Sequence, residues 1–176
     1  PVFEEMEIRP LSHRALLSYL EERGIAPAIA QRHCKEVHFR LYGKRYFAIG
    51  YGNRCGGFEL RNRFFKGCIP PKDITSFRQG SSSCHLYEGF MDWLSALTLG
   101  IGNEEDSLVL NSVANVDKAI PALENYQEIV CHLDHDDAGR RTVEVLRKHF
   151  GECVTDHSGL YSGYKDLNEY LVAKQK

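Results

Sequence analysis

The chain has 176 residues, of which 43% are hydrophobic and 26% charged, a composition that excludes disorder, collagen and coiled coil as the main state. Its apolar runs are only a few residues long, far short of the ~18 that a membrane span needs. The N-terminus lacks the basic start and the apolar stretch of a signal peptide. Because the first residue is proline rather than methionine, we expect a processed chain or a fragment of a longer one.

The six cysteines are spread along the chain without a C-x-x-C pair. This spacing argues against a zinc knuckle or ribbon and against a compact disulfide framework. We therefore expect a reduced, cytoplasmic protein with no zinc site within this chain and no membrane contact.

The net charge of −2 hides a strong asymmetry along the chain. Residues 31–79 contain eleven Lys or Arg and three acids, a net charge of +8, so the other residues together carry −10. A basic segment joined to an acidic one indicates two functional surfaces.

The first third of the chain predicts two helices and then short strands. Apolar residues at helical spacing predict a helix over residues 12–23 with Ser12 as its N-cap, and a second helix is expected over 27–34. From 37 to 65, short β-rich runs are separated by glycine-containing turns, which is typical of an antiparallel meander. Residues 1–79 are therefore predicted to form a small, basic α+β lobe.

The small, polar segment 80–83 predicts a domain boundary. Beyond it, short apolar strands alternate with helical segments, which predicts parallel β-α-β units with right-handed crossovers and an α/β domain over residues 84–176. The strands are expected at 84–88, 107–111, 128–133 and near 152–155, and the helices at 90–99, 115–125 and 137–149. Ligands of such a sheet bind just outside the carboxyl ends of its strands.

Acidic residues follow the predicted strands. Glu88 ends the first strand, Asp134 and Asp136 follow the third, and Asp166 lies in a loop near the C-terminus. Carboxylates gathered at one edge of a sheet repel one another unless a cation compensates, and hard oxygen ligands favour Mg²⁺ or Mn²⁺. EF-hand, P-loop and dinucleotide-binding patterns are all incomplete. Helix capping by Asp136 or Asp137 is an alternative, but it explains one aspartate rather than the set.

Two motifs carry a resemblance to a known family. YEGFMDWLSAL, followed later in the chain by LDHDDAGRRT, resembles the signature of the Toprim domain, which is shared by DnaG-type primases, topoisomerases and some nucleases. YLEERGI and GGFELRNRFFKG are similar to segments that precede Toprim in DnaG-type polymerase domains and their mobile-element relatives. The resemblance implies a Toprim, Rossmann-like parallel sheet domain preceded by the smaller basic lobe.

The resemblance also implies roles for individual residues. Glu88, Asp134 and Asp136 match catalytic acids, with Glu88 beside the reacting phosphate. Together with Asp166 they are the expected ligands of Mg²⁺ or Mn²⁺, and Asp92 matches a further acid of the primase motif.

The sequence departs from the primase pattern at Asn168, where a second acid of the C-terminal loop is typical. This difference implies a weaker second metal site unless Glu169 substitutes. Gly89 and Gly139 are expected to let a phosphate or metal approach the backbone where helices begin.

The basic lobe mixes positive and aromatic side chains. Arg54, Arg61, Arg63 and Lys66 alternate with three phenylalanines, a mixture suited to phosphate contacts and base stacking on single strands. The alternative is that the phenylalanines fill the core of the meander while the basic residues are solvated. For Arg61 and Lys66 the primase resemblance favours template or nucleotide binding.

Several metal-like features are interpreted as structural. In the pairs Cys84-His85 and Cys131-His132, neighbours on a strand face opposite sides of the sheet, so neither pair forms a metal site. The spacing of Trp93 from neighbouring apolar residues places it on the apolar, packing face of the predicted helix 90–99.

These observations predict a DNA primase-like nucleotidyltransferase core that uses a divalent metal on single-stranded DNA. A Toprim nuclease that cleaves phosphodiesters and a non-catalytic nucleic-acid-binding module are the alternatives. Nucleotides and single-stranded DNA are the expected partners, together with a helicase or an upstream zinc-binding domain of the kind that primases of this family usually carry.

Overall fold

The computed structural model describes residues 2–176 and divides into two compact units, one ending at Lys72 and the other beginning at Asp73. The sequence places the boundary later, at 80–83. Residues 73–79 fall in the second unit because a short strand within them pairs with its sheet. Within the described residues, no helix is long and apolar enough to cross a bilayer.

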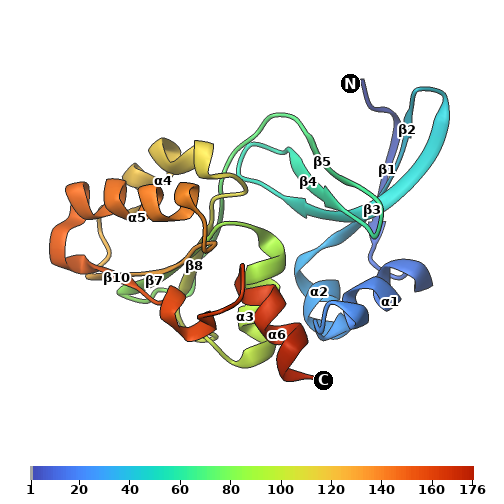
Figure 1. Cartoon of the computed structure of the whole chain (residues 1–176). Helices are drawn as coiled ribbons and strands as arrows, with labels where there is room; N and C mark the ends of the chain where they lie inside the picture. The colour runs from blue at the N-terminus through green and yellow to red at the C-terminus, as the bar shows by residue number, and fades with distance from the viewer. Residues whose placement is uncertain (1) are drawn as a thin grey trace. The chain divides into compact units, whose positions relative to one another are not determined.

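The first unit is a five-stranded antiparallel sheet in the order β1-β2-β3-β4-β5, with two helices between its first two strands (Figure 1). The strands are β1 (Glu4–Pro10), β2 (Lys35–Leu41), β3 (Lys44–Gly52), β4 (Phe58–Arg61) and β5 (Lys66–Ile69). The helices are α1 (Arg14–Glu22) and α2 (Pro27–His33). The predicted α+β lobe and its meander are present, with β1 as an additional strand on one edge.

The N-cap of helix α1 lies one residue later than the sequence predicts. Nδ1 of His13 accepts the Ala15 N–H at 3.2 Å, so His13 rather than Ser12 is the N-cap. The N–H groups of Ser12 and His13 donate instead to the buried carboxylate of Glu36, at 3.1 and 2.7 Å. Glu36 therefore ties the start of α1 to β2.

The core of the first unit lies on one face of β2, β3, β4 and β5 and includes Val37, Phe39 and Leu60. Phe58 and Phe65 pack against this core, whereas Phe64 is 92% exposed at the β4–β5 turn. Two of the three phenylalanines in the basic segment are thus structural, and one is free to contact a ligand.

The second unit has a mixed sheet in the order β10-β9-β7-β8-β6. Its first four strands pair in parallel, and β6 closes one edge as an antiparallel strand. The strands are β6 (Thr75–Phe77), β7 (Ser83–Tyr87), β8 (Asp106–Val109), β9 (Glu128–His132) and β10 (Val154–Asp156). The α-helices are α3 (Phe90–Leu99), α4 (Val116–Leu123), α5 (Asp137–Phe150) and α6 (Leu167–Lys174), and 3₁₀ turns cover Val113–Asn115, Gly151–Cys153 and Ser158–Tyr161. This confirms the predicted α/β architecture.

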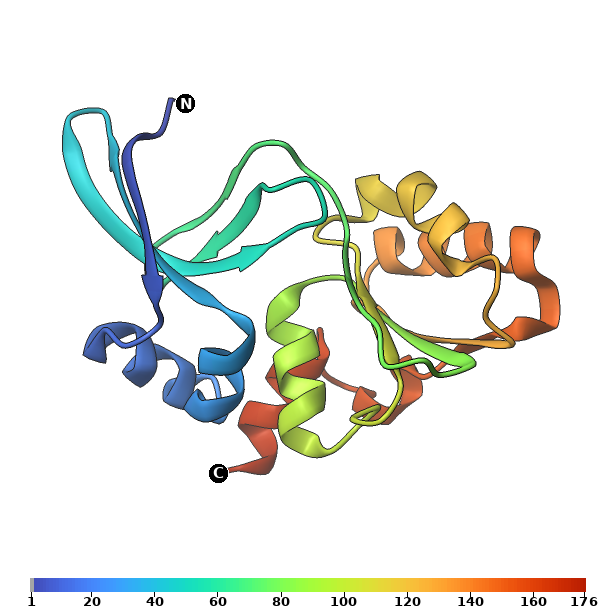
Figure 2. The same cartoon turned by 180° about the vertical axis from the view of Figure 1, so that it is seen from behind.

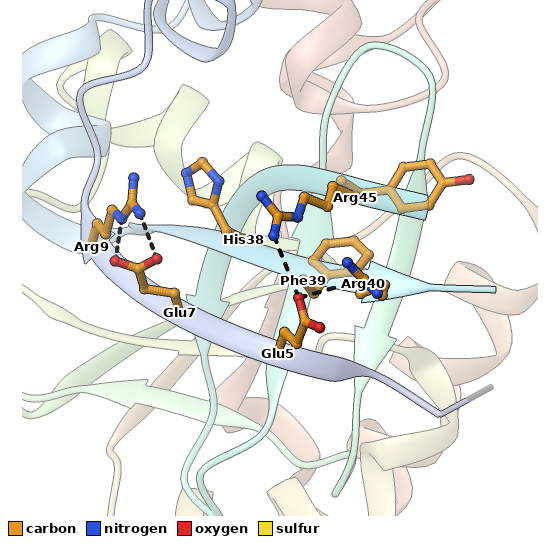
Figure 3. Close-up of a pocket in the computed structure, with 8 residues that line it drawn as sticks. Glu5, Glu7, Arg9, His38, Phe39, Arg40 and Arg45 are labelled. Atoms are coloured by element: carbon orange, nitrogen blue, oxygen red, sulfur yellow. Dashed lines mark hydrogen bonds and ion pairs between the residues drawn. The ribbon is translucent and has the colours of Figure 1, made fainter. Parts of the chain in front are cut away.

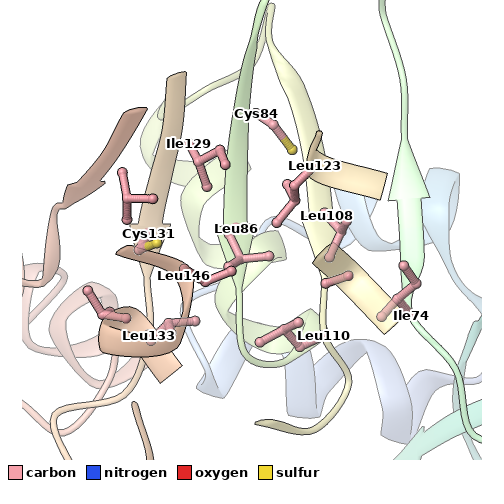
Figure 4. Close-up of a cluster of buried hydrophobic side chains, with 13 residues drawn as sticks. Ile74, Cys84, Leu86, Leu108, Leu110, Leu123, Ile129, Cys131, Leu133 and Leu146 are labelled. Carbon is pink, nitrogen blue, oxygen red and sulfur yellow. The ribbon is translucent and has the colours of Figure 1, made fainter. Parts of the chain in front are cut away.

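Helices cover both faces of this sheet. Helices α4 and α5 lie on one face, and α3 and α6 lie on the other (Figures 1 and 2). The face beneath α4 and α5 carries the main apolar core, which includes Leu86, Leu108, Cys131 and Leu146 (Figure 4).

The two Cys-His pairs obey the alternation of a strand. Cys84 and Cys131 point into the core of Figure 4, so His85 and His132 lie on the opposite face. There Nδ1 of His85 lies 2.9 Å from Nε2 of His132, and Nε2 of His85 lies 2.7 Å from the Glu105 carboxylate. The histidines thus join β7 to β9 on the face opposite the two cysteines, which is the alternation that the sequence predicts.

Buried Asp106 holds the chain that enters β7. Its carboxylate accepts the N–H groups of Gln79 and Ser81 at 2.7 and 3.1 Å and the Tyr126 hydroxyl at 2.6 Å. Burial acts to raise the pKa of Asp106, but the hydrogen bonds from Tyr126 and the backbone outweigh it and lower that pKa below its ordinary value.

Candidate functional site

Two acidic residues meet at the carboxyl edge of the second sheet. Glu88 follows β7, and Asp134 lies just beyond the adjacent parallel strand β9. The N–H of Asp134 donates to Oε2 of Glu88 at 3.4 Å, which makes the two residues direct neighbours. Parallel pairing places them there, because the carboxyl ends of neighbouring parallel strands share one edge.

The electrostatic environment of Asp134 is negative. Burial, followed by the charges of Glu88 and Asp166, raises the pKa of Asp134 to about 7, while Lys165 acts in the opposite direction. Asp136 contributes a smaller repulsion. At neutral pH this carboxylate is therefore held close to other negative charges at a free-energy cost.

Asp92 belongs to the same neighbourhood from the side of α3. Burial, and then the charges of Asp166 and Asp134, raise the pKa of Asp92 well above its ordinary value. Its Oδ1 accepts the N–H of Asn168 at 3.2 Å, which links α3 to the start of α6. We call Glu88, Asp92, Asp134, Asp136 and Asp166 the acidic cluster.

Two members of the acidic cluster also cap helices. Oδ1 of Asp136 accepts the Gly139 N–H at 2.8 Å at the start of α5, and Oδ1 of Asp166 accepts the Glu169 N–H at 2.7 Å at the start of α6. The capping alternative is therefore real for these two residues. Each cap uses one of the two carboxylate oxygens.

Among residues 2–176, no group of three or more acidic, histidine or cysteine side chains has a geometry that could bind a metal ion. The donor set still suits a hard divalent cation, since it consists of carboxylates and includes no sulfur ligand, and burial and neighbouring charges raise the pKa values of Asp92 and Asp134. The metal roles of Glu88, Asp134, Asp136 and Asp166 stay predictions.

The departure from the primase pattern at Asn168 has a structural explanation. Asn168 is only 1% exposed, and its side-chain amide donates to the hydroxyl oxygen of Ser95 on α3 at 2.8 Å. Glu169 accepts the Lys165 N–H at 2.7 Å. Asn168 therefore packs α6 against α3, and Glu169 stabilises the turn that carries Asp166.

Residue His135 fixes the loop that carries Asp166, a role that the sequence analysis missed. The His135 N–H donates to the Lys165 carbonyl at 2.7 Å, and its Nδ1 lies 2.6 Å from the Tyr164 carbonyl oxygen. The Tyr161 hydroxyl donates to the Leu133 carbonyl at 2.7 Å. The segment after β9 is thereby tied to the segment before α6, which brings Asp134 and Asp166 together.

Gly139 and Gly89 differ in what surrounds them. A Cβ atom on Gly139 would lie 2.2 Å from the Asp134 carbonyl oxygen, so this glycine is required by the packing of α5 itself. A Cβ atom on Gly89 would meet only Asp92, at an ordinary 3.7 Å. The protein therefore leaves room for a ligand at Gly89, whereas Gly139 serves the fold.

The four predicted basic residues do not form one group. Arg61 is paired directly with Lys66 across β4 and β5, and its Nε donates to the Tyr19 hydroxyl at 3.0 Å. Arg63, in the adjoining turn, forms an ion pair with Glu22. Arg54 lies in the β3–β4 turn, beyond the opposite end of β4. Arg61, Arg63 and Lys66 thus share one end of the sheet with exposed Phe64, and Arg54 does not.

Comparison with known families identifies the second unit. A family model described as Toprim-like matches residues 85–171, and one described as a domain of unknown function matches residues 5–70. The chain therefore contains a Toprim-like domain, which confirms the resemblance of its two motifs. No curated protein sequence matches the chain.

Solved structures place the whole chain among proteins with a primase fold. The primase fragment of the bacteriophage T7 primase-helicase protein matches with a TM-score of 0.68 at 17% identity, over 100% of this chain and 80% of that one. T7 primase domains bound to an RNA/DNA hybrid and dTTP match with a TM-score of 0.64 at 16% identity, over 98% and 88%. A primase fragment of Aquifex aeolicus with zinc-binding and RNA polymerase domains matches with a TM-score of 0.62 at 15% identity, over 94% and 57%. The protein is a Toprim-containing chain with the fold of these primase fragments.

Proposed function

We propose that the protein is a primase-type nucleotidyltransferase core that joins nucleotides on a single-stranded DNA template with a divalent metal ion. One observation carries the proposal: the acidic cluster brings Glu88 and Asp134 into contact at the sheet edge where α/β proteins bind ligands. The raised pKa of Asp134 supports it, because a partly buried group of carboxylates without a compensating cation is costly.

The acidic cluster supplies the proposed metal ligands. Glu88, Asp134, Asp136 and Asp166 would hold Mg²⁺ or Mn²⁺, which when bound neutralises charge on a reacting phosphate. Asp92 is a supporting residue, since it links α3 to α6 through Asn168. Phosphate groups have access to the start of α3 because the space beside Gly89 is open.

In this proposal the first unit supplies nucleic-acid contacts. Arg61, Arg63 and Lys66 offer phosphate contacts, and the exposed ring of Phe64 offers a stacking surface. Arg61 and Arg63 would exchange their present partners, Tyr19 and Glu22, for phosphate oxygens. A helicase or a zinc-binding domain remains a proposed partner, and the Aquifex fragment includes such a zinc-binding domain.

The experiment follows a labelled nucleotide and a labelled template in the same reaction, with a pre-annealed primer and without one, in Mg²⁺, in Mn²⁺ and in EDTA. Metal-dependent incorporation of nucleotide is expected, and it should fall by at least about 100-fold in Glu88→Gln and Asp134→Asn. Asp137→Asn is the matched control, because Asp137 is adjacent in sequence but exposed and paired with Arg140.

Three outcomes would overturn the proposal. Degradation of the template without incorporation would identify a nuclease, and binding without either reaction would identify an accessory module. Incorporation that survives Glu88→Gln would show that the acidic cluster is not the active site.

A further inference from the structure

The β2–β3 hairpin ends in an unusual turn. Its two turn residues, Tyr42 and Gly43, both have positive φ angles, 50° and 74°. Such a two-residue turn favours asparagine followed by glycine, and a bulky residue in this conformation is strained. Tyr42 is 83% exposed, so little packing within the chain offsets that strain.

Two arginines stand opposite one another just below this turn. Arg40 on β2 is the direct cross-strand partner of Arg45 on β3. Like charges in this position destabilise a sheet. The Arg45 side chain is 82% exposed, so the hairpin presents both a strained aromatic residue and a repulsive arginine pair.

A single carboxylate lies between the two arginines. Oε2 of Glu5 is 3.4 Å from Nε of Arg40 and 3.8 Å from the Arg45 guanidinium (Figure 3). Glu5 itself has a positive φ of 48° and sits where the β1–β2 register shifts. Apart from glycines, Glu5, Tyr42 and Asn111 are the described residues with positive φ. Glu5 contacts the hairpin through Arg40 and Arg45, and Tyr42 lies in the turn of the same hairpin.

Glu5, Arg40 and Arg45 line a groove of about 250 Å³. Arg9, His38 and Tyr46 also line it, with Arg9 already paired to Glu7 (Figure 3). Pockets that enclose a small molecule are larger, about 300–1,000 Å³. A groove of this size and charge suits one phosphate group of a longer chain.

We propose that the β2–β3 hairpin is a second contact site for single-stranded nucleic acid, in which a backbone phosphate replaces Glu5 between Arg40 and Arg45 and a base stacks on Tyr42. Guanidinium groups match phosphate oxygens in geometry, and base stacking on an exposed ring is independent of sequence. The proposal relies on the proposed function only for the class of partner. Double-stranded DNA fits less well, because its bases are stacked on each other and cannot reach Tyr42.

The test measures binding of the full chain to a fluorescent oligothymidylate of about 20 nucleotides by anisotropy, in EDTA and over a series of salt concentrations. Tyr42→Asn is the sharpest variant, because asparagine suits the turn. Its melting temperature should equal or exceed that of the wild type, while its affinity should fall about 5- to 100-fold. A purely structural role for Tyr42 predicts neither result.

Charge variants test the phosphate interaction. Arg40→Gln with Arg45→Gln should reduce the slope of log affinity against log salt by about 0.7, the value for the one phosphate that the two arginines neutralise together. Arg147→Gln with Lys148→Gln removes two exposed charges from α5 and should leave the slope unchanged. Glu5→Gln removes the competing carboxylate and should tighten binding several-fold.

The proposal is overturned if the wild type does not bind the oligonucleotide, if Tyr42→Asn binds as tightly as the wild type, or if the two double variants have equal salt slopes. Its failure is distinct from failure of the proposed function. Metal-dependent synthesis without a role for the hairpin refutes only this site, and hairpin-dependent binding without synthesis refutes only the enzyme.

Discussion

A Cβ atom on Gly139 would lie 2.2 Å from the main-chain oxygen of Asp134, so the first turn of α5 closes directly against the end of β9. This contact positions Asp134 and the capping carboxylate of Asp136 within one tight turn. The end of β9 cannot move far from α5, because β9 is an inner strand that pairs with a neighbour on each side. The glycine is therefore part of how the acidic cluster is built.

Gly139→Ala should destabilise the protein more than Gly89→Ala. Gly139→Ala should lower the free energy of unfolding by about 1–3 kcal/mol or more, since the new methyl group meets backbone. Gly89→Ala should cost less than about 1 kcal/mol, because its φ of −133° suits alanine and the space is open. Thermal melts monitored by circular dichroism measure both.

If a phosphate approaches Gly89, Gly89→Ala should reduce nucleotide incorporation while the protein remains folded. Full activity in a stable Gly89→Ala protein would show that no ligand uses that space.

Removal of charge from the acidic cluster should stabilise the protein while it abolishes activity. Asp134→Asn removes a carboxylate that Glu88 and Asp166 repel, so the melting temperature in EDTA should rise by several degrees, at roughly 2–4 °C per kcal/mol. Millimolar Mg²⁺ should raise the melting temperature of the wild type but not that of the variant. Equal Mg²⁺ responses in the two proteins would contradict metal binding at Asp134.

The carboxylate of Asp106 should make stability depend on pH. Its pKa is lowered in the folded state, so the stabilisation is present above the ordinary aspartate value of 3.8 and is lost as the pH falls through the lower folded value. Asp106→Asn should therefore cost about 1.5–3 kcal/mol at pH 7 and progressively less below pH 3.8. Urea unfolding at several pH values measures the difference, and a constant difference would contradict this role.

Restoring the acid that is typical of the primase pattern should harm this protein. Asn168→Asp would place a carboxylate in a nearly inaccessible site beside Asp92 and would replace the amide that donates to Ser95. The melting temperature should fall, with a loss on the order of 2–4 kcal/mol from burying a like charge. Glu169→Gln is the control, because it keeps a side-chain oxygen that can accept the Lys165 N–H. An unchanged melting temperature for Asn168→Asp would show that the pocket accepts an acid.

The sequence predicted the parallel sheet and the meeting of its strand ends because alternating apolar strands and helices carry that information directly. It did not reveal β1, whose seven residues are all exposed and give no core signal. It also did not reveal β6, which has only three residues and depends on β8 for its pairing. Helix α6 was interpreted as part of a loop, since a possible ligand residue, Asp166, stands at its cap.

Long-range contacts of single side chains were beyond sequence reasoning. The N-cap of α1 is His13 rather than the predicted Ser12, and this difference depends on Glu36, which is distant in the sequence. The role of Asn168 likewise depends on Ser95 and Asp92 across the α3–α6 interface. Periodicity and spacing report which face a residue occupies, but they do not report its partner on another element.

Strand β1 has a consequence for self-association. It pairs with β2 on one side only, and its outer edge is protected by several glutamates and a shift in register that hinder pairing with a second chain. The strand it covers, β2, carries Val37, Phe39 and Leu41. Deletion of residues 2–10 would turn β2 into an apolar edge, so the shortened protein should form intermolecular β-structure at concentrations where the full chain stays dispersed.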